Sequence, residues 1–202
     1  MPKKSGRPAK GDEKNSREHI IDTTVSMIKT KGADAITVRN ICNEAGLSIG
    51  TFYHYFRDKD DLMMYFLSET AFDNCSLKTD PSKVSERICE LYMKLISKYQ
   101  ELGLDFMKSF YSTSNRSLSA YMGEVDGVFA PGTVMARSEK ELNDALSFGY
   151  ISENADIHTV CMDICTIVKG CVFEWCLNDG KADIQTSLHR LIGNYLSPII
   201  IS

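Results

Sequence analysis

The sequence lacks a long hydrophobic run. In its 202 residues no stretch approaches the roughly 20 apolar residues of a membrane-spanning helix. The amino terminus is basic but has no apolar segment of the kind that a secretory signal peptide carries. These absences predict a cytoplasmic protein without a membrane partner. Hydrophobic residues make up 43% and charged residues 25% of the chain, which indicates a folded globular protein.

Catalytic and metal-binding signatures are also missing. There is no nucleophile elbow, phosphate-binding loop or pair of catalytic carboxylates. The cysteines include no Cys-x-x-Cys pair, and no histidine stands at a spacing that would complete a zinc site. We therefore expect no enzymatic activity, no catalytic residue, no cofactor and no metal.

The seven cysteines indicate a reduced protein, because an odd count without a secretion signal argues against structural disulfides. Cys161, Cys165, Cys171 and Cys176 fall on one predicted helix, so a thiol oxidation switch is one interpretation. The alternative is that they are small apolar residues of the core.

Strand-like alternation is absent, and nearly every apolar pattern has the helical period, which predicts an all-α fold of about nine helices. In the first helix, Ile21, Val25 and Ile28 are expected to line the buried face, with Ser16 as its cap and Gly32 as its stop. The expected helices cover residues 16–31, 38–45, 49–56, 58–74, 82–102, 133–148, 157–177 and 184–196, with shorter pieces within 104–130.

The net charge of −4 conceals an asymmetry. Residues 1–60 carry 11 Lys and Arg against 8 Asp and Glu, whereas the remainder carries 12 against 19. A basic end on an acidic body suits a protein that presents one end to a polyanion.

The stretch from Thr37 to Phe56 has the length and punctuation of a helix-turn-helix. Thr37 and Ser48 stand where caps are needed, Gly46 breaks the first helix, and Phe52 and Phe56 form one core face of the second. Around that face the second helix carries small, hydroxyl, phenol and imidazole groups instead of Glu and Lys. Such groups suit donation to phosphates and contact with base edges, which indicates double-stranded DNA as the partner.

The ordered run from Ile36 to Leu62 resembles the signature of TetR-family regulators. The matching pieces are Thr37-Val38-Arg39, Ala45-Gly46-Leu47-Ser48, Gly50-Thr51-Phe52-Tyr53, Tyr55-Phe56, and Lys59 before Leu62. Cys42 and Thr24 stand where the family usually has Ala, and both are small enough to leave the packing intact.

The resemblance implies three sets of DNA contacts. Those expected to face bases are Ile49, Gly50, Tyr53 and His54. Those expected to hold phosphates are Thr37, Arg39, Ser48, Tyr55 and Lys59, and Thr51 fits either purpose. The alternative for Tyr53 and His54 is a partly exposed aromatic without function, and for Arg39 and Lys59 a solvated charge.

The first residues form a basic stretch, Lys3-Lys4-Ser5-Gly6-Arg7-Pro8-Ala9-Lys10, which partly matches an AT-hook that lies in a minor groove. The alternative is a disordered solubilising tail. We expect residues 1–13 to form a flexible arm, residues 14–74 the helix-turn-helix DNA-binding domain, and residues 75–202 a helical domain for effector binding and dimerisation.

The resemblance also implies a homodimer and an unidentified small-molecule effector. The dimerisation candidates, from the last two helices, are Gly170, Phe173, Trp175, Leu188, Leu191 and Ile192. The effector candidates are Tyr65, Tyr92, Met93, Tyr99, Phe106, Met107, Phe110 and Tyr111, with Phe66, Tyr121 and Phe129 beside them. The alternative, which is the more common role of such residues at helical spacing, is that each of them is plain core.

The sequence therefore predicts a repressor that an effector releases from a palindromic operator. The alternative is a DNA-binding regulator that responds to cysteine oxidation or has no effector.

Overall fold

A computed structural model describes residues 10–32, 35–68, 72–111 and 122–201. Within these ranges the chain forms nine α-helices, one 3-10 turn and two isolated β-bridges, and none of these helices is long and apolar enough to cross a membrane. This confirms the predicted all-α class. Two compact units, residues 1–63 and 64–202, meet within one helix and are described separately. The domain boundary expected after residue 74 stays a prediction.

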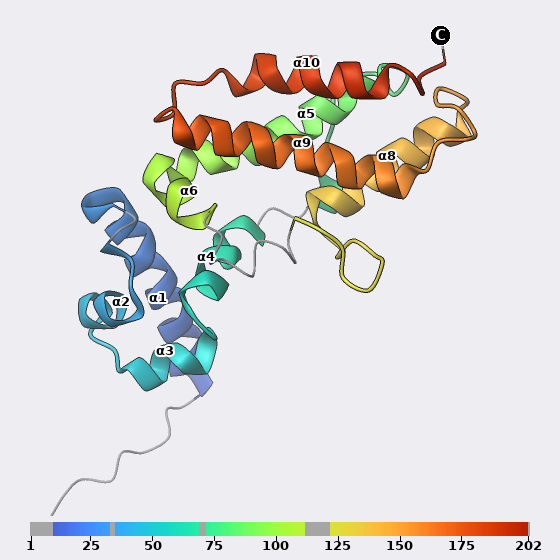
Figure 1. Ribbon diagram of the computed structural model, residues 1–202. Coiled ribbons are helices and arrows are strands. Elements are labelled where there is room, and N and C mark those ends of the chain that lie inside the picture. Colours follow the sequence, from blue (N-terminus) through green and yellow to red (C-terminus); the bar gives the residue numbers. More distant parts are fainter. Residues whose placement is uncertain (1–9, 33–34, 69–71, 112–121, 202) are drawn as a thin grey trace, which may run out of the picture. The chain divides into compact units, whose positions relative to one another are not determined.

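The first unit, the head, is built from three helices and the start of a fourth (Figure 1). They are α1 (Lys10–Lys31), α2 (Val38–Ala45), α3 (Ile49–Tyr55) and α4 (Lys59–Ser68). Helix α1 packs against both α2 and α3, and these two pack against each other. The predicted basic arm lies mostly in residues 1–9, outside the described residues.

Helix α1 begins six residues before the expected start at Ser16. Ser16 therefore lies inside the helix and is not its cap. At the other end Gly32 adopts a left-handed φ of 78° and donates its N–H to the carbonyl of Ile28. The predicted glycine stop is confirmed.

The buried face of α1 differs from the predicted one. Ile20, Thr24 and Met27 are at most 2% exposed, whereas the expected Ile21, Val25 and Ile28 are only half-buried. The hydroxyl of Thr24 donates to the carbonyl of Ile20 at 2.8 Å, which satisfies the polar group inside the core. A buried threonine therefore replaces an apolar residue, and the helix is rotated relative to the apolar pattern.

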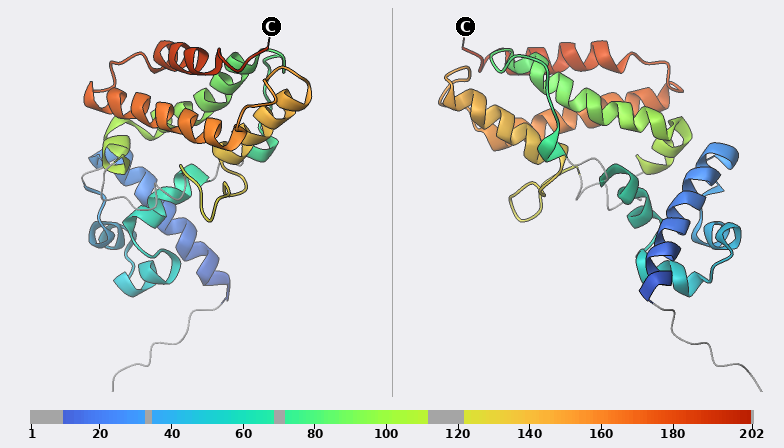
Figure 2. Two further views of the ribbon diagram at one scale, coloured as in Figure 1. Left: turned by 45° about the vertical axis from the view of Figure 1, so that its right-hand side comes forward. Right: turned by 180° about the vertical axis from the view of Figure 1, so that it is seen from behind.

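The second unit, the body, contains η2 (Phe72–Asn74), α5 (Val84–Leu102), α6 (Leu104–Phe110), α8 (Val134–Ser147), α9 (Ile157–Leu177) and α10 (Ile184–Leu196). Helix α5 packs against α8 and α10, and α9 packs against α6, α8 and α10, as the two views in Figure 2 show. The bounds of α9 and α10 agree with the sequence analysis. Helix α4, expected to reach residue 74, ends at Ser68.

Each of the last three helices begins at a residue whose side chain accepts a hydrogen bond from a backbone N–H three residues later. The caps are Thr133, Asp156 and Asp183, with distances of 3.2, 3.2 and 3.0 Å. Because a side-chain oxygen then replaces a missing helical partner, these caps determine where the helices start.

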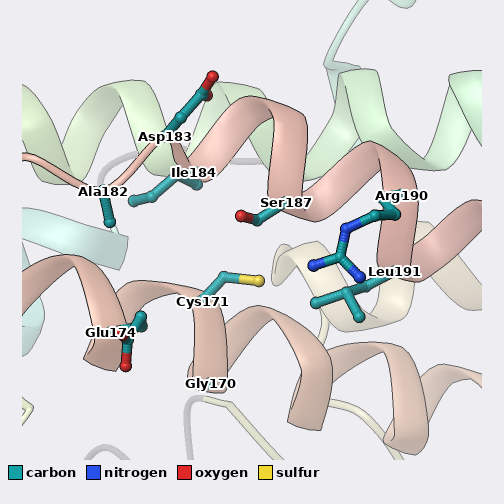
Figure 3. A pocket seen from close by; sticks show the side chains of 9 residues that line it. All are labelled: Gly170, Cys171, Glu174, Ala182, Asp183, Ile184, Ser187, Arg190 and Leu191. Carbon is teal, nitrogen blue, oxygen red and sulfur yellow. The ribbon is translucent and has the colours of Figure 1, made fainter.

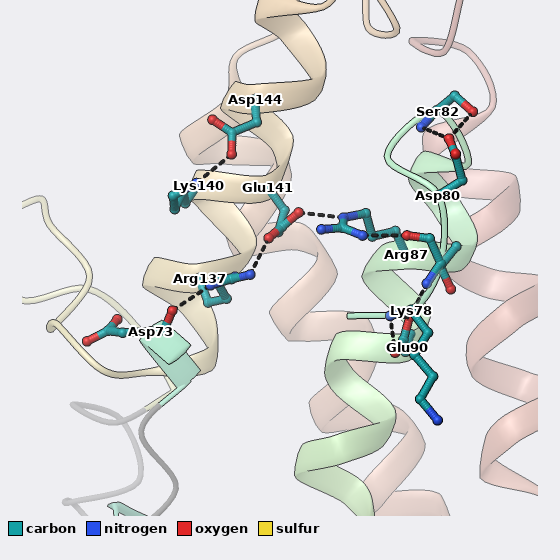
Figure 4. Close-up of polar contacts among 11 residues, drawn as sticks. Asp73, Lys78, Asp80, Ser82, Arg87, Glu90, Arg137, Lys140, Glu141 and Asp144 are labelled. Atoms are coloured by element: carbon teal, nitrogen blue, oxygen red, sulfur yellow. Dashed lines mark hydrogen bonds and ion pairs between the residues drawn. The ribbon is translucent and has the colours of Figure 1, made fainter. Parts of the chain in front are cut away.

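A buried ion network holds α5 to α8 (Figure 4). The Glu141 carboxylate accepts from Arg87 Nε at 2.6 Å and lies 2.7 Å from Nη2 of Arg137, and all three side chains are at most 16% exposed. Arg137 also donates to the carbonyl of Asp73 at 2.6 Å, and Arg87 donates to the carbonyl of Thr79. The network thus connects two helices of the body to the segment that enters α5.

Candidate DNA-binding surface

The helix-turn-helix is formed by local signals that the sequence carries. Thr37 Oγ1 accepts from the Asn40 N–H at 3.1 Å and caps α2, and Ser48 Oγ accepts from the Thr51 N–H at 3.0 Å and caps α3. Between them Gly46 has a left-handed φ of 65°, a conformation that disfavours residues with a Cβ atom. The predicted caps and turn are confirmed.

Two phenylalanines hold α3 against the head. Phe52 is 0% and Phe56 is 4% exposed, and their ring centroids are 5.6 Å apart. The guanidinium of Arg17 lies 5.4 Å from the centroid of the Phe56 ring, within cation–π range. Since this face of α3 is buried, its opposite face is left to solvent.

The exposed face of α3 consists of the residues that the sequence analysis assigned to base contacts. Ile49 and Tyr53 are 49% and 56% exposed, and Gly50 and His54 are exposed as well. Positions three or four residues apart lie on one side of a helix, so Ile49 with Tyr53, Gly50 with Tyr53, and Gly50 with His54 are neighbours on this face. A Cβ added at Gly50 would meet only Ser48 Oγ, at an ordinary 3.6 Å. The chain's own packing therefore does not require glycine here.

The residues assigned to phosphates surround this face. Arg39 is exposed, and Tyr55 and Lys59 are half-buried. The hydroxyls of Ser48 and Thr51 already share a hydrogen bond of 2.8 Å, and that of Thr37 caps α2. These three side chains have structural roles beside any contact with DNA.

Sequence reasoning gave no role to Arg57, whose side chain is 81% exposed at the end of α3 and pairs with Asp61 at 3.1 Å. Arg57 could have been identified from its position directly after Phe56, a predicted core residue, because a cation at that position lies next to the exposed face of α3.

Most of the effector candidates form a tightly packed interior in the body. Tyr92, Tyr99, Phe106, Met107 and Phe110 are at most 2% exposed, and Met93, Tyr65 and Tyr111 are half-buried. The Tyr92 hydroxyl lies 3.4 Å from Met135 Sδ, and that of Tyr99 lies 3.6 Å from Met122 Sδ. Phe129 is buried, whereas the side chains of Phe66 and Tyr121 are outside the described residues.

The dimerisation candidates divide into two groups. Trp175, Leu188 and Ile192 are at most 8% exposed and pack inside the protomer, which leaves them little surface for a partner. Gly170 and Phe173 are exposed, and Leu191 is half-buried. A hollow of about 180 Å³ runs between α9 and α10 beside Gly170 and Leu191, with Glu174 and Arg190 on its opposite sides (Figure 3).

This arrangement defines the class of protein. A capped helix-turn-helix presents a solvent-exposed α3 bearing tyrosine, histidine and glycine, and a larger helical domain follows it. The head thus has the build of the helix-turn-helix domain of a DNA-binding regulator.

Comparison with known proteins identifies the family that the head resembles. Residues 20–65 match the sequence model described as "Bacterial regulatory proteins, tetR family". The head of the chain therefore carries the DNA-binding region that this family shares.

Two curated relatives and one solved structure are similar over much of the chain. The HTH-type transcriptional regulator PksA of Bacillus subtilis is 27% identical over 72% of this chain and 63% of its own length, so the match leaves more than a third of that relative uncovered. The fatty acid metabolism regulator protein of the same organism is 24% identical over 82% of this chain and 86% of its own. The structure of SmeT, the repressor of the Stenotrophomonas maltophilia multidrug efflux pump SmeDEF, has a TM-score of 0.63 at 17% identity and covers 95% and 93% of the two chains.

Proposed function

We propose that the chain represses transcription by binding a palindromic operator as a homodimer and that a small molecule releases it. The observation that supports this most directly is the face of α3 formed by Ile49, Gly50, Tyr53 and His54, which is exposed while Phe52 is buried behind it. A recognition helix reads the major groove with such a face.

The roles around this face follow from chemistry and position. Tyr53 and His54 touch base edges, and Gly50 allows the backbone to approach the duplex closely. Arg39 and Lys59, with the hydroxyls of Tyr55 and Thr37, hold phosphates. Arg57 joins this group, because it is a highly exposed cation at the end of the same helix.

Dimerisation uses the exposed part of α9 and α10. Two heads must reach two half-sites, which calls for a two-fold interface. Phe173 is half exposed, and a Cβ added at Gly170 would meet nothing within 4 Å in the same protomer, so this surface can receive another helix. Glu174 and Arg190 beside it supply charges of opposite sign for a self-complementary contact.

The effector binds among the aromatic and methionine side chains between α5, α6 and the start of α8. Methionine adapts to different ligand shapes, and the phenol groups of Tyr92 and Tyr99 give polar contacts in an apolar interior. The named roles of two similar proteins, in fatty acid metabolism and in repression of an efflux pump, fit a regulator that responds to a small and partly apolar compound.

Binding selection on random double-stranded DNA tests the proposal, and a palindromic site is expected. Tyr53→Ala and His54→Ala should each cost about 1–3 kcal/mol and relax the preference at particular bases. Lys59→Ala should weaken binding to all sequences and lower the salt slope by about 1. Lys181→Ala, at an exposed lysine of the body, is the control and should change neither. A single non-symmetric site would contradict the dimer.

The competing mechanism is release by cysteine oxidation. Burial raises the pKa of Cys161 to about 12 and that of Cys165 to about 11, so both thiols stay protonated and poorly reactive near neutral pH. Iodoacetamide at pH 8 should therefore label the half-exposed Cys75 before either of them. If peroxide released DNA from the wild type but not from a variant with Ser at Cys161, Cys165, Cys171 and Cys176, the thiol switch would replace the effector model.

A further inference from the structure

Residues 122–132, which lead into α8, form a loop that is fastened to the body and is called the strap below. Its first described residue, Met122, is 1% exposed. The Met122 carbonyl accepts from Cys165 Sγ at 3.1 Å and from Lys169 Nζ at 3.3 Å, and its sulfur lies 3.6 Å from the Tyr99 hydroxyl. Met122 therefore connects the strap to α9 and to the aromatic interior at α5.

The middle of the strap is a tight reversal. Val125 and Val128 exchange two backbone hydrogen bonds of 2.9 and 3.2 Å. Between them Asp126 and Gly127 have positive φ angles of 54° and 78°, the pattern of a two-residue hairpin turn. The strap thus has a defined shape, and its residues on either side of the turn can act as fixed attachment points.

His158, in the first turn of α9, attaches the strap on both sides of this turn. Its Nε2 lies 2.6 Å from Glu124 Oε2 of the strap, and its Nδ1 lies 2.8 Å from Glu139 Oε1 of α8. Phe129 of the strap stacks on the imidazole, with centroids 4.4 Å apart and planes at 17°. One side chain therefore joins the strap, α8 and α9.

The geometry requires a doubly protonated ring. An ionised carboxylate only accepts hydrogen bonds, so each of the two ring nitrogens must carry a hydrogen to donate. In the neutral imidazole one nitrogen has a lone pair instead, and that lone pair would face a carboxylate oxygen. Loss of the proton therefore replaces one of the two attachments by repulsion.

The charged groups around the ring act in the same direction. Hydrogen bonds to Glu124 of the strap and to Glu139 of α8 raise the pKa of His158. On α9 itself, Asp156 caps the helix two residues before the ring and adds a third negative charge. Cys161, one turn further on, has a pKa of about 12 and stays neutral. No cation faces the ring among the groups that shift its pKa.

We propose that His158 is a proton-operated latch that holds the strap closed over the aromatic interior of the body. A raised pKa in the folded state means that the charged ring stabilises the closed strap fully below the ordinary histidine pKa. This stabilisation disappears as the pH rises through the folded-state pKa. Opening moves Met122 away from Tyr99. Where this aromatic interior receives the effector, the proton on His158 controls the effector's access to the interior. This last step rests on the proposed function.

Hydrogen exchange of the full-length protein between pH 6 and pH 9 tests the latch. After correction for the intrinsic pH dependence, exchange of strap peptides should rise several-fold with pH in the wild type, while peptides of α10 serve as the internal reference. His158→Gln should exchange fast at every pH. Glu124→Gln should lower the pH at which the His158 ring titrates in an NMR spectrum, and Glu153→Gln, at an exposed glutamate of the loop before α9, should not.

Strap exchange that does not change with pH in the wild type, or that changes equally in His158→Gln, would overturn the latch. If His158→Gln failed to fold, Glu124→Gln would still decide, because it removes the negative charge of one partner and leaves the ring in place. The measurement involves neither DNA nor effector, so its failure would leave the proposed repressor function untouched. A protein that bound no operator could conversely still show the latch.

Discussion

Glu141 is the side chain of the body whose removal should reveal most about its stability. It lies between two arginines, at 2.6 Å from Arg87 Nε and 2.7 Å from Arg137 Nη2, and only 6% of its side chain is exposed. Glu141→Gln keeps the shape but removes the only acid that the structure pairs with both guanidinium groups. Breaking a buried ion pair by removal of one partner costs about 3–5 kcal/mol, because a charge is left buried without compensation.

The size of the effect can be read from thermal unfolding followed by circular dichroism. We expect a loss of about 3 kcal/mol for Glu141→Gln, since the amide oxygen still accepts one hydrogen bond. For a chain of this size each kcal/mol lowers the Tm by about 2–4 °C, so the Tm should fall by about 6–12 °C.

Helix α8 supplies a matched control. Lys140 and Asp144 have the same four-residue spacing as Arg137 and Glu141 and a distance of 2.5 Å, but their side chains are 63% and 49% exposed. Asp144→Asn should therefore cost only about 0.3–0.5 kcal/mol. Equal losses for the two substitutions would show that burial does not decide the strength of these pairs and would refute the reasoning.

A triple variant separates charge from packing. Arg87→Met, Arg137→Met and Glu141→Leu together remove every charge of the network and keep most of its volume. Because the desolvation of three ionised groups then disappears, its stability should lie close to that of the wild type. A loss larger than that of Glu141→Gln alone would mean that the hydrogen bonds to the carbonyls of Asp73 and Thr79 contribute most of the stabilisation.

Three further outcomes are expected. Thr133→Ala should destabilise the body by about 1–2 kcal/mol in urea denaturation, because the hydroxyl caps α8 and also donates to the carbonyl of Ala130, and Thr133→Ser should recover most of this. Gly46→Ala should cost about 1–2 kcal/mol from its positive φ alone, since the added Cβ would meet nothing within 4 Å. Leu188→Ala should lower stability by about 2–5 kcal/mol, because this side chain is fully buried in the protomer. Phe173→Ser, at the proposed dimer surface, should instead lower the mass measured by light scattering from that of a dimer toward that of a monomer, with little effect on the protomer's own stability.

The parts of the fold that could be predicted are those determined by near neighbours in the chain. Thr37 and Ser48 cap helices through atoms three residues away, and Gly46 ends α2 by its own backbone conformation. Such interactions depend only on short segments of the chain, so the sequence predicts the helix-turn-helix and the exposed face of α3. The same holds for the bounds of α9 and α10.

For the first helix, the sequence predicts the helix itself correctly but predicts the wrong face as the buried one. Apolar residues occur on more than one side of α1, and a search for apolar spacing selects Ile21, Val25 and Ile28. The structure instead buries Thr24, at 0% exposure, because its hydroxyl is satisfied by the preceding turn. A polar residue that supplies its own partner is invisible to a pattern that counts only hydrophobic positions.

Contacts between distant residues could not be predicted at all. Arg87 and Glu141 are 54 positions apart, and His158 and Glu124 are 34 apart, so no spacing rule connects them. In the sequence, nothing distinguishes any of these residues from an ordinary polar or charged residue of the surface. Their pairing depends on how α5, α8 and α9 pack, which is decided by the whole core.

The last two helices illustrate the same limit for the dimer. A helix that packs on its own domain and on a partner needs two apolar faces, and both faces have the helical period. Trp175, Leu188 and Ile192 therefore look like interface residues in the sequence, but the protomer itself covers them. Phe173 leaves half of its surface to solvent although it has the same apolar character. Only the folded protomer distinguishes the two faces, and the proposed interface is correspondingly confined to Gly170, Phe173 and Leu191 with the charged residues beside them.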